Sequence, residues 1–384
     1  MIYLYIKIMD SKSLYSKTPI IIDIGTSSIK AGLSGQEKPS LIFPNYFGEM
    51  KYSKSVGSWK DDDKKHIIGN DCNKYFGVVK LKYPLSHGIF NNSEDISSIF
   101  EYIYSNLDMS ITEIKEHPVL IAEPLLNPQE NRRNIAKVLF DTYKIEQIFF
   151  ASQPILSLFS TSSTSGAVLE SGDGVTQSCI IYEGYTIPGS YKRINLGGKE
   201  VTEYLQYLLN KKGHELRNSD GFQITKKIKE ELCEICSPEN ENKLEPKNYT
   251  LPDDSILEIG EERRLAPEIL FNPLIREYEY PGIQEILAES INKTNVDLKL
   301  QLYGSILLSG GNTNIKGMKE RIYKEIKKLA PKKAKIRLHT PSNPENCCWI
   351  GCNIISSLEI SKEMWISVKE YMEKGENILH TRTI

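Results

Sequence analysis

Two glycine-containing turns, each placed directly after a short apolar stretch, constrain the fold of this chain more than any other feature. The first occupies residues 23–30 (DIGTSSIK) and the second residues 170–176 (ESGDGVT). Their leading acids, Asp23 and Glu170, are 147 residues apart (170 minus 23). Because each turn combines an acid at a strand end with glycine in the turn that follows, this spacing indicates an internal duplication of one αβ domain. The chain has 384 residues, which is enough for two such domains.

The residue types in these turns suit a phosphate and its metal ion. Glycine lets the backbone approach an oxyanion closely, and successive N–H groups form an anion-binding concavity. Carboxylates can hold Mg²⁺ through the waters that this ion retains. Either turn alone is more often only a tight turn, but the two together predict a nucleotide site. A third glycine element, residues 308–313, joins a buried strand to a helix, and its glycine pair would let an adenine lie against the backbone.

Strand-like and helix-like segments alternate along the chain, as an α/β fold requires. We expect strands at residues 20–24, 40–43, 119–122, 147–151, 167–170, 178–182 and 305–308. We expect helices at residues 93–105, 129–143, 198–212, 225–235, 284–292 and 316–329. The repeated βα order predicts mostly parallel sheets that are covered on both faces. Two hydrophilic stretches, residues 51–70 and 237–248, are interpreted as surface insertions because strand and helix patterns resume directly after each.

Composition excludes several other classes of protein. The chain is 40% hydrophobic and 26% charged, which is typical of a globular protein, and its net charge of -2 argues against nonspecific binding to nucleic acid. The basic run at residues 324–335 is interpreted as a solvated face, with a phosphate-binding patch as the alternative. No stretch reaches the roughly 20 apolar residues that span a bilayer. Residues 1–9 lack the basic leader and cleavage site of a signal peptide, so we expect a reducing compartment.

The seven cysteines form an odd, unevenly spaced set, which is a poor framework for disulfides. Cys233 and Cys236 have a C-x-x-C spacing that could bind zinc. No second C-x-x-C and no nearby histidine accompany them, so we favour two thiols on a helix face. Three more cysteines flank Trp349 in an apolar segment, and we expect them in the core: Cys347, Cys348 and Cys352.

From about residue 19 onward the chain resembles the actin family. The segments that carry this resemblance, in actin order and spacing, are residues 81–84, 116–120, 123–128, 171–176, 181–185, 309–311 and 364–367. Within the family, residues 264–268 and 328–332 look more like centractin, the actin-related protein of the dynactin filament. The resemblance implies the duplicated ribonuclease-H-like α/β domains of actin, Hsp70 and sugar kinases, arranged around a central nucleotide cleft that binds ATP or ADP with Mg²⁺.

The same resemblance implies a division of the chain. Residues 1–18 would be an N-terminal extension. The first half would comprise residues 19–159 with 340–384 and would contain an inserted loop at 49–70. The second half would comprise residues 160–339 and would contain an inserted subdomain at 199–263.

The family's site residues can be carried over wherever this sequence matches. The β- and γ-phosphates would be held from one half by Gly25, Thr26, Ser27 and Lys30, and from the other by Asp173, Gly174 and Val175. Asp23, with Glu170, would hold the waters of the magnesium ion. Gln153 matches the glutamine that orients the attacking water. The ribose and adenine would be contacted by Gly198, Lys229, Glu230, Gly310, Gly311 and Asn312, with Glu345 beside the base.

Three positions depart from the family pattern. Glu170 stands where the family has Asp, Gln177 stands where it has a water-positioning His, and Glu345 replaces a basic residue beside the adenine. The longer Glu170 side chain changes how magnesium is held, and a glutamine can bind water but cannot carry charge. We therefore expect ATP binding with hydrolysis slower than in conventional actin. Neutral drift at all three positions is the alternative.

Assembly is predicted from two segments that mediate subunit contacts in actin. The loop at residues 49–69 has only Tyr52, Val56 and Trp59 as apolar anchors among charges. The plug segment, residues 274–278, carries a charged Arg–Glu pair where the family is apolar. We therefore expect short or capped filaments, or co-assembly with other actin-like chains. Actin-binding or dynactin-type proteins would use an apolar cleft lined by Phe159, Ile354, Leu358 and Met364.

Three functional classes remain open. A cytoskeletal filament subunit in the cytoplasm leads, because the match includes residues 364–367 near the end of the sequence. A non-polymerising actin-related subunit of a chromatin or regulatory complex, which would place the protein in the nucleus, is the second class. A sugar kinase or Hsp70-like ATPase shares the two phosphate turns and is the third. For the two actin-like classes, any enzymatic activity would be at most a weak conversion of ATP to ADP and phosphate.

Overall fold

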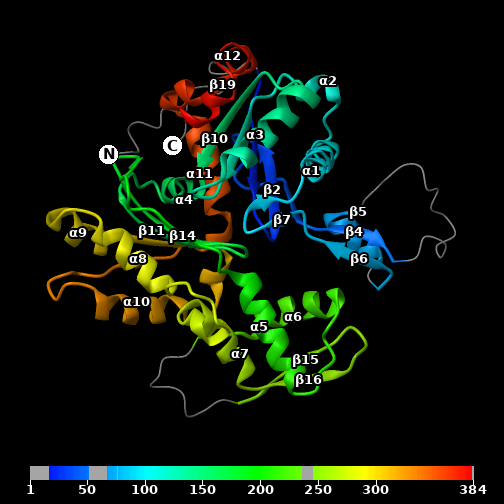
Figure 1. Cartoon of the computed structure of the whole chain (residues 1–384), viewed down its shortest axis with the longest axis vertical. Helices are drawn as coiled ribbons and strands as arrows, with labels where there is room; N and C mark the ends of the chain where they lie inside the picture. Colours follow the sequence, from blue (N-terminus) through cyan, green and yellow to red (C-terminus); the bar gives the residue numbers. More distant parts are fainter. Residues whose placement is uncertain (1–16, 52–66, 76, 236–244, 383–384) are drawn as a thin grey trace. The chain divides into compact units, whose positions relative to one another are not determined.

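The computed structural model describes residues 17–51, 67–75, 77–235 and 245–382 (Figure 1). The chain divides into two compact units. The first comprises Met1–Thr164, Tyr182–Thr186 and Asn346–Ile384, and the second comprises Ser165–Ile181 and Ile187–Glu345. The loop anchors Tyr52, Val56 and Trp59, together with Cys236, lie outside the described residues. Within the described ranges, no helix is long and apolar enough to cross a membrane.

The first unit is built on a mixed sheet of six strands in the order β19-β10-β9-β1-β2-β3. Their bounds are β1 (Ile20–Ile24), β2 (Ser28–Leu33), β3 (Leu41–Pro44), β9 (Val119–Glu123), β10 (Gln147–Ser152) and β19 (Ile366–Ser367). Only the pairs β1–β9 and β9–β10 are parallel, so the prediction of a mostly parallel sheet is wrong. The connection from β1 to β2 is a tight turn, and so short a connection can join only antiparallel strands.

Both faces of this sheet are covered, as predicted. Alternate residues of β1 enter different cores because successive strand side chains point to opposite faces. Ile20 and Ile22 pack with residues of α1 (Ser93–Asn106) and α3 (Gln129–Lys137). Ile21 instead packs with Trp349 of α11 (Cys347–Ser356), which contacts α4 (Gln153–Phe159). The cysteines that flank Trp349 are buried, which confirms their placement in the core: Cys347, Cys348 and Cys352.

Smaller elements complete the first unit. A second, three-stranded sheet contains β4 (Phe47–Met50), β5 (Ile67–Ile68) and β6 (Val79–Lys82). A π-helical turn, η4 (Val138–Thr142), continues α3, so the predicted helix at 129–143 is two helical types in sequence. The remaining elements are η3 (Gly69–Tyr75), β7 (Leu85–Ser86), β8 (Ile89–Phe90), α2 (Ile111–Ile114), β13 (Tyr185–Thr186), η10 (Glu359–Met364), α12 (Val368–Lys374) and η11 (Glu376–His380).

The second unit repeats the central pattern of the first. Its sheet contains β11 (Gly166–Ser171), β12 (Thr176–Tyr182), β14 (Lys192–Ile194), β17 (Ile306–Ser309) and β18 (Leu338–His339). β11 pairs antiparallel with β12 across the second glycine turn and parallel with β17. In the first unit, β1 pairs antiparallel with β2 across the first glycine turn and parallel with β9. The two turns therefore occupy equivalent positions in two sheets of the same local topology.

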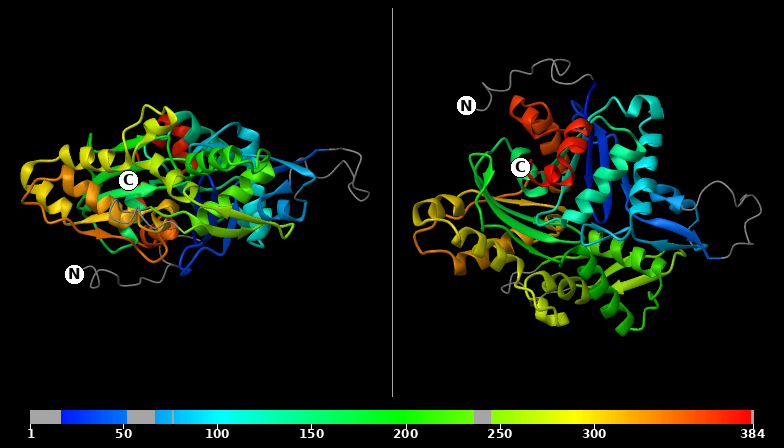
Figure 2. Two further views of the ribbon diagram at one scale, coloured as in Figure 1. Left: turned by 90° about the horizontal axis from the view of Figure 1, so that it is seen from below. Right: turned by 45° about the horizontal axis from the view of Figure 1, so that its top comes forward.

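Helices of the second unit pack on its sheet through one large apolar cluster. Both views of Figure 2 show α8 (Ile283–Asn292, yellow) beside α10 (Met318–Leu329, orange), and the two helices are in contact. The lysines of the basic run at positions 327, 328, 332, 333 and 335 are exposed, as expected of a solvated face. The other elements are α5 (Gly198–Lys211), α6 (Ser219–Leu232), β15 (Lys247–Thr250), β16 (Ile256–Ile259), α7 (Glu262–Leu265), η6 (Ala266–Leu270), η7 (Pro273–Arg276), α9 (Val296–Tyr303), η8 (Gly311–Asn314) and η9 (Pro344–Asn346).

The predicted helix at residues 225–235 differs from the structure at both ends. Helix α6 begins six residues earlier, at Ser219, because the side chain of Asn218 caps it by accepting a hydrogen bond from the Gly221 N–H. The helix ends at Leu232, and Cys233 is extended and buried. Cys233 therefore follows the helix and does not lie on its face.

Candidate functional site

The first glycine turn is fixed by its own backbone. The Gly25 N–H donates to the Ser28 carbonyl at 3.1 Å and closes the turn between β1 and β2. A Cβ placed on Gly25 would lie 2.7 Å from that same carbonyl oxygen, closer than such atoms can approach. Any residue other than glycine would therefore open the turn.

Three side chains that the sequence analysis singled out come together beside this turn. Asp23 and Lys30 are cross-strand partners on β1 and β2, and the Lys30 Nζ lies 3.3 Å from Asp23 Oδ2. Gln153, the first residue of α4, donates from Nε2 to Asp23 Oδ1 at 3.1 Å. All three are buried. Because both oxygens of the Asp23 carboxylate accept hydrogen bonds, this group is held in one orientation.

The outer side of the first turn is held by residues from other parts of the first unit. Thr26 Oγ1 accepts a hydrogen bond from the Gly88 N–H at 3.1 Å. The backbone N–H of Asn45 donates to the Ser27 carbonyl at 3.0 Å, and its side chain donates to the Gly25 carbonyl at 2.9 Å. Asn45 follows β3 and is fully buried. Asn45 was not predicted from the sequence, because no local pattern marks an asparagine whose partner lies 20 positions earlier.

The second turn is joined to the start of helix α5. The Gly172 N–H donates to the Val175 carbonyl at 2.9 Å, as Gly25 donates to Ser28 in the first turn. The N–H groups of Gly198 and Lys199 donate to the carbonyls of Gly172 and Asp173, at 3.0 and 2.9 Å. The turn thus satisfies N–H groups that the first residues of a helix leave without a partner inside the helix.

Lys229 and Asp173 meet at the same place. The buried Lys229 ammonium donates to the Gly198 carbonyl at 2.9 Å and lies 3.8 Å from Asp173 Oδ1. Burial lowers the pKa of Lys229, and the Asp173 carboxylate opposes this shift. A Cβ on Gly198 would lie within about 3 Å of polar atoms of Lys229, Asp173 and Asn312. The backbone of Gly198 is therefore surrounded by polar groups, whereas Glu230, the next residue after Lys229, is exposed.

The third glycine element is joined to the second turn. Gly310 has a φ of 86°, and a Cβ there would lie 2.3 Å from the Ser171 carbonyl oxygen. Asn312 is buried and donates from Nδ2 to Ser171 Oγ at 2.9 Å and to the Gly172 carbonyl at 2.7 Å. Around Gly311, in contrast, no described atom lies within 4 Å of an added Cβ. Glu345 accepts a hydrogen bond from Asn314 at 3.0 Å.

Glu170 and Gln177, two of the three positions that depart from the family pattern, lie in one row across the second sheet. Glu170 of β11 is the cross-strand partner of Gln177 on β12 and of Ser309 on β17. Gln177 in turn faces Arg193 on β14, where burial lowers the pKa of the guanidinium. Arg193 was not predicted from the sequence, since its register with Gln177 depends on the pairing of β12 with β14. Gln177 is fully buried, so its side-chain amide is enclosed by other residues of the protein.

The donor sets of the two turns fit a nucleotide phosphate with a hydrated Mg²⁺ ion. Each set combines backbone glycine, one lysine and a carboxylate. Buried oxygens without a hydrogen-bond partner belong to Asn45, which holds the first turn, and to Ser178 and Ser309 on strands β12 and β17. Among the described residues, no group of three or more His, Cys, Asp or Glu side chains could hold a metal directly. Mg²⁺ commonly keeps several of its waters, and the Asp23 carboxylate could accept hydrogen bonds from them.

The predicted protein-binding surfaces belong to different units. In the first, Phe159, Ile354, Leu358 and Met364 are all half-buried, and Phe159 and Met364 pack against the core around Trp349. In the second unit, the plug segment exposes Leu274 (68%) and Ile275 (40%). Its arginine is not isolated: the Arg276 guanidinium lies 4.4 Å from the centre of the Tyr207 ring and 5.5 Å from that of Tyr204.

Two units of repeated α/β topology, each with a glycine turn and a charged pair at the end of its central strand, define the actin type of α/β fold. Comparison with known proteins agrees with this class. The family profile named Actin matches residues 15–384. The chain is also similar to an actin-like protein of Neurospora crassa, with 38% identity over 375 residues, covering 95% of this chain and 97% of the relative. The chain belongs to the actin family.

Proposed function

We propose that this protein binds ATP or ADP with Mg²⁺ and serves as a subunit of short or co-assembled actin-like filaments. The observation that carries the nucleotide proposal is that each unit places a lysine and a carboxylate beside its glycine turn: Lys30 and Asp23 beside Gly25 in the first unit, and Lys229 and Asp173 beside Gly172 in the second. Bound Mg²⁺ would supply positive charge that neutralises the phosphate oxygens.

The residues of the first unit have separate parts in this proposal. The backbone of Gly25, Thr26 and Ser27 and the Lys30 ammonium contact phosphate oxygens. Asp23 is oriented by Lys30 and Gln153, so its carboxylate can accept hydrogen bonds from the metal's waters.

In the second unit, the turn residues Asp173, Gly174 and Val175 also contact the phosphates. Glu170 contributes to holding the metal's waters. The ribose and adenine are contacted by the residues around the start of α5 and the third glycine element: Gly198, Lys229, Glu230, Gly310, Gly311 and Asn312, with Glu345 beside the base.

Slow hydrolysis is the second part of the proposal. The Gln153 Nε2 is engaged with Asp23, and Gln177 cannot take up a proton as a histidine would. The decisive measurement is the rate of phosphate release by the purified protein, beside conventional actin under the same conditions. A rate equal to that of actin would contradict this part.

For assembly, the supporting observations are the exposed Leu274 and Ile275 and the cation–π contact of Arg276 with Tyr207, which gives the charged plug residue a partner within its own unit. We propose a cytoplasmic, cytoskeletal location, a centractin-like role, and binding of actin-binding or dynactin-type proteins near Phe159 and Ile354.

Calorimetric titration with ATP and ADP, followed by sedimentation and electron microscopy at micromolar concentration, tests the whole proposal. We expect nucleotide binding and short filaments. Absence of binding would overturn the nucleotide proposal. Long homopolymers would contradict the assembly proposal, and binding without any filament would favour the non-polymerising actin-related subunit.

A further inference from the structure

Two asparagines from unrelated positions in the sequence make the same contact with the two glycine turns. Asn45 Nδ2 donates to the Gly25 carbonyl at 2.9 Å, and Asn312 Nδ2 donates to the Gly172 carbonyl at 2.7 Å. These glycines are equivalent, because each follows the leading acid of its turn by two residues. Both asparagines are almost fully buried, with exposed fractions of 1% and 5%.

The two turns also share their internal hydrogen bond, from the glycine N–H to the carbonyl three residues later. Each asparagine makes a further contact with its turn. The Asn45 N–H donates to the Ser27 carbonyl, and Asn312 Nδ2 also donates to Ser171 Oγ. Each asparagine is therefore anchored to its turn by a second hydrogen bond, although the second bond comes from the backbone in Asn45 and from the side chain in Asn312.

Holding a carbonyl oxygen also fixes the N–H group that follows it. A peptide unit is planar and trans, so its oxygen and its N–H point in opposite directions. The Gly25 carbonyl shares its peptide plane with the Thr26 N–H, and the Gly172 carbonyl shares its plane with the Asp173 N–H. Within the described ranges, neither of these two N–H groups donates to another group of the chain. Each is an oriented donor of the kind that stabilises an anion.

We propose that Asn45 and Asn312 are a matched pair of positioning residues that set these two peptide planes for the phosphates of a nucleotide. This inference rests on the proposed nucleotide binding. It gives Asn312 a role through the Gly172 peptide in place of a direct contact with the adenine. Without the asparagine donor, the Gly25 carbonyl loses the side-chain hydrogen bond that orients it, and the Gly172 carbonyl is still held by the Gly198 N–H at 3.0 Å. Each peptide plane is then held less firmly, and its carbonyl oxygen can turn toward the phosphate, where it would repel the anion.

The test compares the variants Asn45→Ala and Asn312→Ala with wild type in their affinity for ATP and for adenosine, by competition against a fluorescent adenine nucleotide. We expect each variant to bind ATP about tenfold more weakly, the effect of losing the buried hydrogen bond to the turn carbonyl. Adenosine has no phosphate, so its affinity should stay within about twofold of wild type. A role in folding alone would lower the melting temperature without changing the ratio of the two affinities.

Matched controls remove the same kind of bond elsewhere. Asn91 donates from Nδ2 to the Tyr83 carbonyl in the first unit, and Asn210 donates to the Gln206 carbonyl in the second, both at 2.8 Å. Asn91→Ala and Asn210→Ala should leave the ATP-to-adenosine ratio unchanged. If an alanine variant of Asn45 or Asn312 fails to fold, the serine variant, which retains a short hydroxyl group, takes its place.

Each outcome assigns the failure to one proposal. If wild type binds ATP and the variants of Asn45 and Asn312 bind it equally well, the positioning role is wrong. The same conclusion follows if ATP and adenosine weaken in equal proportion. If wild type itself binds no ATP, the proposed function fails and the positioning role falls with it.

Discussion

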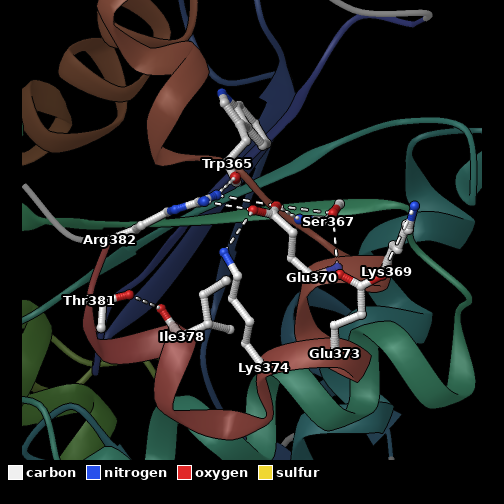
Figure 3. A network of polar contacts seen from close by, with 9 residues as sticks. All are labelled: Trp365, Ser367, Lys369, Glu370, Glu373, Lys374, Ile378, Thr381 and Arg382. Atoms are coloured by element: carbon white, nitrogen blue, oxygen red, sulfur yellow. Dashed lines mark hydrogen bonds and ion pairs between the residues drawn. The ribbon is translucent and has the colours of Figure 1, made fainter.

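Glu370 and Arg382 form a two-point ion pair near the end of the described chain (Figure 3). Arg382 Nη2 lies 2.6 Å from Glu370 Oε1, and Nη1 lies 3.2 Å from Oε2. Nη1 also donates to the Trp365 carbonyl at 2.9 Å. Glu370 in addition accepts hydrogen bonds from the N–H and hydroxyl of Ser367, which caps α12. One carboxylate therefore joins the start of a helix to the segment that follows it.

This ion pair predicts an acid-sensitive contribution to stability. The hydrogen bond from Arg382 is the largest influence and lowers the pKa of Glu370 from its ordinary value of 4.5 to about 2. A group whose pKa is lower in the folded state stabilises the protein above the unfolded pKa, and this contribution is lost as the pH falls from about 4.5 toward 2. We expect Glu370→Gln to lower the free energy of unfolding by about 1 kcal/mol at pH 6 and to leave it unchanged at pH 2. The effect at pH 6 is small because the ion pair is partly exposed.

Denaturation by urea at pH 6 and at low pH measures this difference. The control is Lys369→Ala, because Lys369 is 82% exposed and lies 4.0 Å from its partner Glu373. Its removal should leave stability unchanged at either pH. Equal loss of stability in Glu370→Gln at both pH values would show that the carboxylate charge is not the cause.

The contribution of Glu200 to stability should depend on pH in the opposite direction. Its carboxyl is buried at the start of α5, and burial, opposed by the hydrogen bond from the Gly197 N–H, raises its pKa to about 7. Because the folded state binds the proton more tightly than the unfolded state, stability falls as the pH rises from about 4.5 to 7 and then stays level. Glu200→Gln keeps an acceptor for Gly197 and carries no charge. We expect the free energy of unfolding of this variant to exceed that of wild type by about 2 kcal/mol at pH 8.

Chemical denaturation at pH 5 and pH 8 gives this result directly. Glu203→Gln, an exposed neighbour on the same helix, should change stability by less than about 0.5 kcal/mol at both pH values. A Glu200→Gln protein less stable than wild type at pH 8 would mean that the carboxylate is charged and stabilising in the folded state.

The adjacent glycines Gly310 and Gly311 should respond differently to alanine. Gly310 has a positive φ, and its added Cβ would meet the Ser171 carbonyl at 2.3 Å, whereas Gly311 faces open space. We expect Gly310→Ala to destabilise the protein by at least about 2 kcal/mol. Gly311→Ala should change stability by less than about 0.5 kcal/mol and serves as the control. Thermal denaturation of both variants without added nucleotide provides the measurement, and similar melting temperatures would contradict the prediction.

Gln177 is the position at which the proposed slow hydrolysis can be reversed. A histidine there would provide a group that can position water and also carry a proton. We expect Gln177→His to raise the rate of phosphate release by roughly tenfold, and the combination with Glu170→Asp to raise it further. The control is Gln177→Asn, which keeps an amide. A Gln177→His rate equal to wild type, in a protein that still binds ATP, would remove this residue from the explanation.

Elements that depend on local composition were predictable from the sequence. The strand at residues 20–24 has the predicted bounds, and those at 119–122 and 147–151 each extend by one residue. The glycine turns also lie where their residues place them, because a short β-branched run followed by glycine allows few other conformations. Membership of the actin family follows from the sequence as well, since it depends on the order and spacing of motifs.

Contacts between distant positions were decided only by the tertiary structure. The sequence names Asp23 and Gln153, but the hydrogen bond between them joins residues 130 positions apart. Likewise, Asn45 becomes part of the first turn only when β3 pairs with β2. Whether neighbouring strands run parallel or antiparallel is not encoded in their residue types. A hydrogen bond across a fold requires its two groups to be brought together by the packing of the elements that carry them, and local sequence patterns do not record that packing.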